Sequence, residues 1–292
     1  MRLVIIGFGL IGGSIARAVR GRTPVGDRWS IAAWSPSGRG PSMALEEGIV
    51  DLAPARIEDA LAGADLVVIA APPLACLEML ALLADRGPAA LPTGAIVTDV
   101  ASTKRAIVER ATELRLPFVG GHPMAGSERS GFAAASADLF VGRPWIVTPS
   151  ALAADEAIIA VERLARSCGA EPIRMDPAVH DRAVAGVSHL PLLLSAALVE
   201  SVTAMSDWPH EARLAASGWS AMSRLAMGDP EMAAGIAVTN AGEIAARARA
   251  LRAVLDRWIV DLEGERPPDA GELRTRFAAA RDSLADERSD RG

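Results

Sequence analysis

Short apolar runs alternate with longer amphipathic stretches through the first half of the chain. The runs are rich in Val, Ile, Leu and Ala and are bounded by Gly, Pro or polar residues, which is typical of buried strands. They lie at residues 2–6, 30–34, 66–70, 95–100, near 118, 145–148 and 171–175. Helix-like stretches lie between them, at residues 10–20, 42–47, 57–62, 74–84, 103–114 and 155–167. Strands that alternate with helices predict βαβ units and a parallel, doubly wound sheet.

The pattern changes after about residue 176. Strand signals vanish, and Ala- and Leu-rich stretches follow at residues 177–205, 211–227 and 231–262. These stretches predict an all-helical second domain, which the segment E-R-P-P at 265–268 brings to an end. We therefore expect an α/β domain at residues 1–172, a helical domain at 173–265 and a partly disordered C-terminal extension at 266–292.

Composition argues against several classes of protein. With 30 basic and 36 acidic side chains the net charge is −6, whereas a nucleic-acid-binding protein carries a basic face. We find no apolar run that approaches the roughly 18–20 residues of a membrane span, so no membrane association is expected. Cys76 and Cys168 are the two cysteines, and they lie too far apart in the sequence for a zinc or redox motif. These features predict a cytoplasmic protein without a metal site.

A glycine-rich motif follows the first predicted strand and opens the first predicted helix. It reads G-F-G-L-I-G and contains Gly7, Gly9, Leu10, Ile11 and Gly12. The first glycine of such a motif makes a tight turn, the second lets a pyrophosphate approach the backbone, and the third lets helix and strand pack closely. The helix N-terminus then offers N–H groups to the phosphates. The strand–turn–helix context predicts a Rossmann-type domain that binds NAD or NADP.

The segment after the second predicted strand favours NADP over NAD. An NAD site usually has Asp or Glu at the end of this strand, where it binds the ribose 2′-hydroxyl. Here the segment reads W-S-P-S-G-R; Asp27 precedes the strand and Glu46 lies on the next helix. We expect Ser35, Ser37 and Arg39 to bind a 2′-phosphate instead. The alternative is an ordinary loop with an exposed arginine.

Candidate catalytic residues cluster in two motifs. His122 lies in G-G-H-P-M-A-G-S-E-R-S-G, interpreted as a loop after the strand near residue 118, and His189 lies in V-S-H-L-P. A histidine beyond the carboxyl end of a parallel strand is a natural general base, although His122 could also serve only to order the loop. His180 could be a cap or a surface residue, and His210 is interpreted as a loop residue.

Two further polar residues are candidates for the same site. Ser102, in D-V-A-S-T-K, is either the N-cap of the next helix or a hydroxyl that reaches cofactor and substrate, and the two roles are compatible. Arg224, in S-R-L-A-M-G-D-P-E, has apolar neighbours and needs an anionic partner, either within the protein or on a substrate.

Taken together, these motifs identify a family. The chain resembles the prephenate/arogenate dehydrogenases of tyrosine biosynthesis, over roughly residues 1–260. The resemblance is carried by the glycine motif, D-V-A-S-T-K, G-G-H-P-M-A-G-S-E, P-W-I-V-T-P, S-H-L-P and S-R-L-A-M-G-D-P-E. It implies a helical domain that binds substrate and forms a homodimer. It also implies an oxidative decarboxylation, in which a cyclohexadienol passes a hydride to the nicotinamide and loses its ring carboxylate as CO₂.

The resemblance also implies roles for individual residues. His122 matches the histidine that accepts the hydrogen bond of the substrate 4-hydroxyl and assists its deprotonation, and Ser102 matches the serine that orients both groups. Arg224 matches the arginine that binds a substrate carboxylate, and His189 matches a further active-site histidine that contacts the substrate.

Three features depart from the family pattern. Many relatives read S-H-L-P-H, where this chain has Leu192, and many have an acidic residue where this chain has Ala221. The third departure is the missing carboxylate after the second strand. Together they favour arogenate with NADP slightly over prephenate.

Three alternatives stay open. One is the dehydrogenation of 4-amino-4-deoxyprephenate in secondary metabolism. The second, a β-hydroxyacid dehydrogenase, would need a lysine early in the helical half, and residues 177–206 contain none. The third is a protein that binds NADP without turnover, and the set of candidate catalytic residues argues against it.

Overall fold

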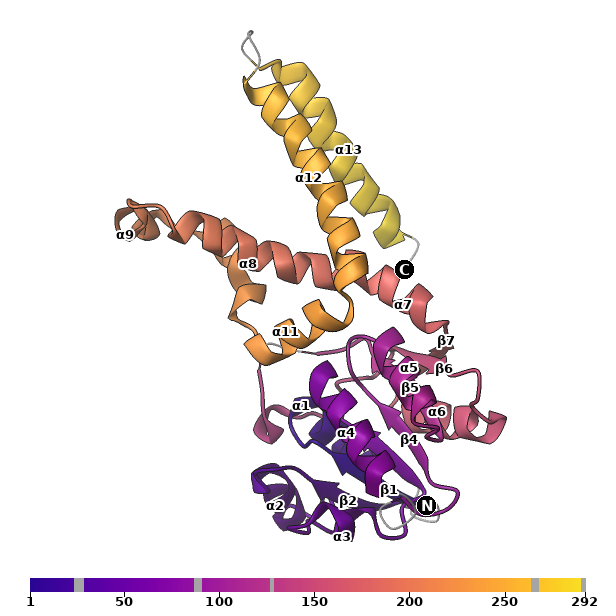
Figure 1. The fold of residues 1–292 in the computed structure, drawn as a ribbon. Coiled ribbons are helices and arrows are strands. Elements are labelled where there is room, and N and C mark those ends of the chain that lie inside the picture. Colours follow the sequence, from indigo (N-terminus) through magenta and orange to yellow (C-terminus); the bar gives the residue numbers. More distant parts are fainter. Residues whose placement is uncertain (24–28, 87–90, 127–128, 264–267, 290–292) are drawn as a thin grey trace. The chain divides into compact units, whose positions relative to one another are not determined.

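The computed structural model describes residues 1–23, 29–86, 91–126, 129–263 and 268–289. Within these ranges a seven-stranded sheet with flanking helices precedes a helical region (Figure 1). The strands are β1 (Arg2–Ile6), β2 (Ser30–Trp34), β3 (Leu66–Ile69), β4 (Ile96–Asp99), β5 (Phe118–Pro123), β6 (Pro144–Pro149) and β7 (Glu171–Arg174). The helical elements among them are α1 (Leu10–Arg22), α2 (Arg39–Glu46), α3 (Ile57–Leu61), α4 (Pro73–Arg86), α5 (Arg105–Glu113), the 3₁₀ turn η3 (Phe132–Ala134) and α6 (Asp155–Ser167).

The sheet has the strand order β2-β1-β3-β4-β5-β6-β7. Neighbours from β2 to β5 are parallel, as the sequence predicts, but β6 runs antiparallel to β5. A parallel return needs a crossover of a dozen or more residues, usually through a helix. Between β5 and β6 the described residues contain only the short turn η3, whereas α6 makes β7 parallel to β6.

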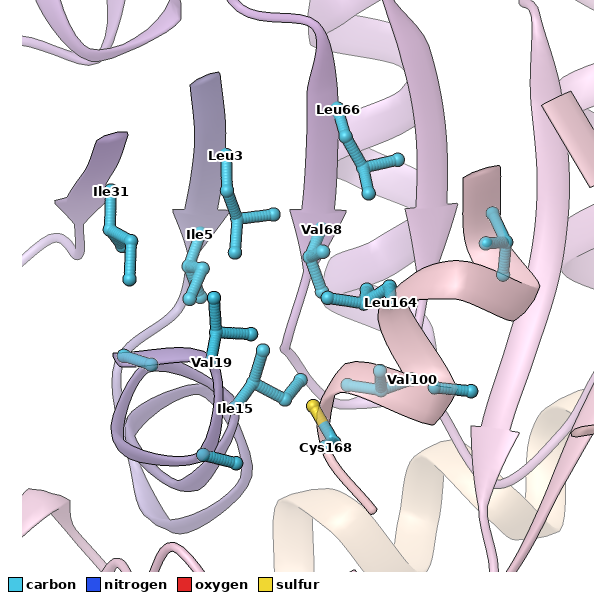
Figure 2. Close-up of a cluster of buried hydrophobic side chains, with 14 of the residues drawn as sticks. Leu3, Ile5, Ile15, Val19, Ile31, Leu66, Val68, Val100, Leu164 and Cys168 are labelled. Carbon is cyan, nitrogen blue, oxygen red and sulfur yellow. The ribbon is translucent and has the colours of Figure 1, made fainter. Parts of the chain in front are cut away.

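Alternate residues of the central strands face two separate hydrophobic clusters. On β1, Leu3 and Ile5 belong to the cluster under α1 and α6, and Val4 and Ile6 belong to the cluster under α3, α4 and α5. Figure 2 shows the first of these clusters, where Leu3 and Ile5 lie near Ile15 of α1. Because both faces are covered by helices, the strands appear in the sequence as continuous apolar runs.

After β7 the described chain is helical, in agreement with the predicted all-helical domain. Its elements are α7 (Pro177–Val184), the π-helical turn η4 (Ala185–His189), α8 (Leu190–Thr203), α9 (Trp208–Glu211), η5 (Ala212–Leu214), α10 (Ser217–Ser223), η6 (Arg224–Met227), α11 (Pro230–Thr239), α12 (Ala241–Glu263) and α13 (Ala270–Ser289). Asp176 and Asp229 cap α7 and α11 through their side chains, and each is followed by proline at the first helical position.

The chain divides into two compact units, Met1–Ile244 and Ala245–Gly292. In the second unit, the rings of Trp258 on α12 and Phe277 on α13 lie 5.0 Å apart. The Arg276 guanidinium lies 3.7 Å from the Trp258 ring centroid and pairs with Asp261. Helix α13 occupies most of the segment expected to be a C-terminal extension, while most of the E-R-P-P segment lies outside the described residues.

One helical run contradicts the expectation that no segment resembles a membrane span. The run Pro177–Thr203, made of α7, η4 and α8, is long and apolar enough by length and composition, with a mean hydropathy of 1.6. The charged and polar residues at its start obscure this in the sequence, but the stretch after His189 is almost wholly apolar. Only 22% of the most apolar window is buried within the chain, so this helix exposes an apolar face.

Candidate active site

The glycine motif forms the turn between β1 and α1. Gly7 has a φ of +87°, and a Cβ atom there would lie 2.2 Å from the Ala70 carbonyl oxygen. A Cβ atom on Gly12 would lie 2.3 Å from the Gly7 oxygen, so packing within the protein explains both glycines. Gly9 differs, because its Cβ atom would meet nothing within 4 Å, and no side chain caps the N-terminus of α1 behind it. This open turn, with Leu10 and Ile11 starting the helix, fits the pyrophosphate of a dinucleotide.

The segment after β2 has the composition that the sequence analysis used to favour NADP. Strand β2 ends at Trp34, so Ser35 follows it directly. Ser37 and Arg39 are exposed, and Arg39 is the first residue of α2. Arg39 makes no hydrogen bond or ion pair with a described residue, so its guanidinium is available to an anion. Asp27 lies outside the described residues.

His122 lies on β5 and not in a loop, which corrects the sequence interpretation. The glycines before it suggested a loop, but they serve close packing of neighbouring strands. A Cβ atom on Gly120 would lie 2.3 Å from Thr148 Oγ1, and one on Gly121 would lie 2.7 Å from the Asp99 carbonyl oxygen. Pairing with β6 continues through His122 to Pro123, the last residue of the strand. Ser127 and Glu128 of the same motif lie outside the described residues.

A chain of hydrogen bonds begins at His122. Its Nδ1 atom lies 2.8 Å from Nε2 of His180, and Nδ1 of His180 lies 2.7 Å from Oδ1 of Asp181. His122 is 7% exposed, and His180 and Asp181 are each 1% exposed. The sequence analysis left His180 as a cap or surface residue, and both alternatives are wrong. Asp176 caps α7, which leaves His180 on the buried face of that helix.

Asp181 also caps α5. Its carboxylate accepts hydrogen bonds from the backbone N–H groups of Lys104, at 2.7 Å, and Arg105, at 3.0 Å. Burial alone would raise the pKa of Asp181, but the hydrogen bonds from His180 and these N–H groups outweigh it and hold the pKa below its ordinary value. The alternative in which Ser102 caps this helix is wrong. Helix α5 starts at Arg105 and not at the predicted residue 103, and the residue at its N-cap position makes no capping hydrogen bond through its side chain.

His189 is placed by Asn240 at the end of the π-helical turn η4. Asn240 Nδ2 donates to the Asp181 carbonyl oxygen at 2.8 Å and lies 3.1 Å from Nδ1 of His189. Flipping the amide would set its oxygen against the Asp181 oxygen, so Nδ1 of His189 is the acceptor and Nε2 carries the proton. Nε2 is buried and forms no hydrogen bond of normal geometry with a described residue. Half-buried Ser102 lies beside the His189 ring, and the backbone of Ser102 approaches that ring.

The environment keeps both candidate histidines neutral near pH 7. Burial lowers the pKa of His122 well below its ordinary value, and the nearby Lys104 ammonium lowers it further. Burial lowers the pKa of His189 to about 4, although Asp181 and the Ser102 backbone oppose the shift. A neutral His122 can accept a proton, and a neutral His189 can donate a hydrogen bond through Nε2.

A buried ion pair that the sequence analysis did not identify supports this region. Lys104, the one lysine of the chain, is fully buried and pairs with fully buried Asp99. Its ammonium also donates to the Gly121 carbonyl oxygen at 2.7 Å, and Asp99 accepts from the N–H groups of Ala101 and Gly121. The pair thereby links the end of β4 to the residue that precedes His122.

A cavity of about 370 Å³ opens beside His189. Apart from this histidine its walls are mainly apolar, and they include Leu192 of α8 with Leu225 and Ala226 of η6. Arg224 is exposed at the start of η6, next to these lining residues. The structure therefore brings His122, Ser102 and His189 into one region and places Arg224 beside the cavity.

The low pKa of His189 predicts a loss of stability in acid. Between about pH 6.5 and pH 4 the unfolded chain binds a proton at this residue and the folded chain does not, so the free energy of unfolding should fall as the pH falls. We expect about 2–3 kcal/mol from this residue. Urea denaturation across this range measures the effect, and His189→Gln should flatten the pH dependence. If the free energy of unfolding changed equally with pH in the unchanged protein and in His189→Gln, the low pKa of His189 would be contradicted.

Two family models together match most of the chain. Residues 15–174 match the family model described as "Prephenate dehydrogenase, nucleotide-binding domain", and residues 176–270 match "Prephenate dehydrogenase, dimerization domain". The chain belongs to the prephenate dehydrogenase family. The prephenate dehydrogenase of Bacillus subtilis is 33% identical over 288 residues, which cover 96% of this chain and 74% of that protein.

Solved structures of prephenate and arogenate dehydrogenases share the fold over at least 97% of the chain. The arogenate dehydrogenase of Synechocystis is 31% identical with a TM-score of 0.77, covering 97% of this chain and all of that one. The prephenate dehydrogenase of A. aeolicus, solved with hydroxyphenyl propionate and NAD⁺, is 25% identical with a TM-score of 0.85, covering 100% and 98% of the two chains. The family resemblance and the Rossmann-type fold that the sequence predicted are thus confirmed.

Proposed function

We propose that this protein catalyses the oxidative decarboxylation of arogenate or prephenate in tyrosine biosynthesis, with His122 as the general base. The observation that carries the proposal is the placement of His122. It is held neutral at the carboxyl end of β5, and its Nδ1 atom is engaged by His180. Among the described residues the hydrogen bonds of His122 involve Nδ1, so Nε2 is available to a substrate hydroxyl.

The proposed chemistry assigns each remaining candidate a task. A nicotinamide cofactor held at the glycine motif of Gly7, Gly9 and Gly12 would supply the acceptor for the hydride that leaves the hydroxyl-bearing carbon of the substrate. Ser102 orients this hydroxyl, and His122 Nε2 accepts its proton as the carbonyl begins to form. Loss of the ring carboxylate as CO₂ then makes the ring aromatic. His189 donates a hydrogen bond from Nε2 to the substrate, and Arg224 binds a substrate carboxylate.

The cavity next to His189 supports a slight preference for arogenate. Leu192 lines it where many relatives have histidine, so one polar contact to the substrate is replaced by an apolar wall. Ala221 stands on α10 where many relatives have an acidic residue. We assign the cofactor site to Gly7, Gly9, Leu10, Ile11 and Gly12 with Ser35, Ser37 and Arg39, within an α/β domain at residues 1–172.

NADP is the preferred cofactor in this proposal. A 2′-phosphate bound next to Ser35 would lie at the segment 35–39, which carries Arg39. The Arg39 guanidinium has no partner among the described residues, and the segment contains no carboxylate that would repel the phosphate. NAD lacks the phosphate and gains nothing from this arginine.

Initial rates of NAD(P)H formation test the proposal, with arogenate and prephenate each combined with NADP and NAD. We expect the highest kcat/KM with arogenate and NADP. Arg39→Ala should raise KM for NADP by about tenfold, the loss of roughly one charged hydrogen bond, and leave KM for NAD unchanged. The exposed Arg110→Ala on α5 is the matched control. No turnover in any combination would refute the function, and preference for prephenate with NAD would refute the specificity.

The exposed apolar face of α8 supports a homodimer, which we include in the proposal. Ser195 is the buried residue of this helix, while Leu193 on the same helix and Val187 on the preceding turn η4 are exposed. The run lies within the part of the chain that matches the family's dimerization domain. We assign the face to a second copy of the helical domain, residues 173–265, and not to a membrane, and we place the enzyme in the cytoplasm.

A further inference from the structure

The hydrogen-bond chain from His122 has a direction. It runs from His122 Nδ1 to His180 Nε2 and from His180 Nδ1 to Asp181 Oδ1. A neutral imidazole has one donor nitrogen and one acceptor nitrogen, so the state of either end fixes every proton between. The question is which end is fixed by the rest of the protein.

Asp181 is the fixed end. Oδ1 accepts from the Lys104 N–H and Oδ2 accepts from the Arg105 N–H, and both donors belong to the backbone at the start of α5. Backbone N–H groups cannot reverse their roles, so the carboxylate stays an acceptor on both oxygens. His180 Nδ1 must therefore donate to Asp181, and His180 Nε2 must accept. His122 Nδ1 is then the donor, and the lone pair of His122 lies on Nε2.

We propose that His180 and Asp181 are positioning residues that hold His122 in the tautomer with its proton on Nδ1. This inference rests on the proposed role of His122 as the base. An imidazole with the proton on Nε2 would present a donor to the substrate hydroxyl and could not take its proton. His180 touches neither substrate nor cofactor in this account and acts through His122.

The other charged and titratable groups around His122 do not supply an alternative partner for Nδ1. Lys104 approaches from the β4–α5 connection, but its ammonium is engaged by Asp99 and the Gly121 oxygen. His189 approaches from η4, and its Nδ1 atom is engaged by Asn240. Each of these groups is held by its own hydrogen bonds, which leaves Nδ1 of His122 to His180.

Two substitutions of His180 separate positioning from general packing. His180→Gln can accept from His122 through its amide oxygen and donate to Asp181 through its amide nitrogen, so it preserves the direction of the chain. His180→Leu removes both hydrogen bonds. We expect His180→Leu to lower kcat by about 10²-fold or more with little change in KM, and His180→Gln to restore kcat to within about tenfold of the unchanged enzyme. His210→Leu, on exposed α9, is the matched control.

Nitrogen-15 NMR of the imidazoles gives a readout that does not depend on turnover. The chain has four histidines, so single substitutions assign every signal. We expect the His122 signal to show a protonated Nδ1 and a bare Nε2 in the unchanged protein and in His180→Gln, and a shift toward protonated Nε2 in His180→Leu.

The kinetic and NMR measurements distinguish failure of the tautomer inference from failure of the proposed function. A protonated Nε2 on His122 in the unchanged protein would overturn the inference, as would a His180→Leu enzyme with normal kcat or an equal loss in both variants. If the unchanged protein shows no turnover of arogenate or prephenate, the proposed function fails, and the NMR spectrum still decides the tautomer.

Discussion

Replacing His122 with asparagine is expected to lower kcat by about 10²–10⁴-fold, the usual contribution of a general base. The asparagine Nδ2 can take the place of the imidazole Nδ1 and donate to His180, so the hydrogen-bond chain keeps its other members in place. The substituted side chain has no nitrogen lone pair to accept the proton of the substrate hydroxyl. Steady-state rates with arogenate and NADP measure kcat.

Two controls make this result specific. Binding of NADP, measured by fluorescence titration, should be unchanged, because the glycine motif lies on a different strand end. His210→Asn replaces an exposed histidine on α9 and should have normal kcat. A His122→Asn enzyme with unchanged kcat would remove His122 from the role of base.

Replacing Lys104 with methionine is expected to lower the free energy of unfolding by about 3–5 kcal/mol, the usual cost of removing one partner of a buried ion pair. Both side chains of the pair are fully buried, so the Asp99 carboxylate would lose its counter-charge where water cannot reach it. The Gly121 carbonyl oxygen would lose a hydrogen bond at the same time. Methionine has a similar length, which limits any contribution from a cavity.

Urea denaturation of the unchanged protein and the variant gives this difference directly. Arg110→Met is the control, because it removes a cation from the exposed pair with Glu113 on the same helix and should cost less than about 1 kcal/mol. Equal losses in the two variants would show that burial does not govern the strength of the Lys104–Asp99 pair.

The sequence determines the strands of the sheet well because both of its faces are covered. Residues 2–6 and 30–34 form β1 and β2 with the predicted bounds, since each apolar run is buried on both sides. The direction of β6 could not be predicted, because it depends on the connection after β5 and not on the pattern within the strand. The short elements η5, α10 and η6 were likewise expected as one stretch at residues 211–227, although Gly218 falls within it.

The candidate site was predictable where a motif carries its own physical reason. The glycine motif and His122 are of this kind. His180 and Lys104 could not be assigned from the sequence. His180 contacts His122, which lies 58 residues earlier, and Lys104 contacts Asp99, which lies five residues earlier across the end of β4. These contacts depend on how α7 meets the start of α5. A weak signal for Lys104 exists, because a chain that otherwise uses arginine for its basic residues has its single lysine there. Arginine carries five N–H donors, whereas the ammonium here donates to Asp99 and the Gly121 carbonyl oxygen.

The most direct test of the account measures NAD(P)H and CO₂ in the same reaction, with arogenate or prephenate labelled at the ring carboxylate and the enzyme-free rate subtracted. Oxidative decarboxylation predicts equal molar amounts of the two products at every time point. Reduced nicotinamide without CO₂, or no product from either substrate, would contradict it.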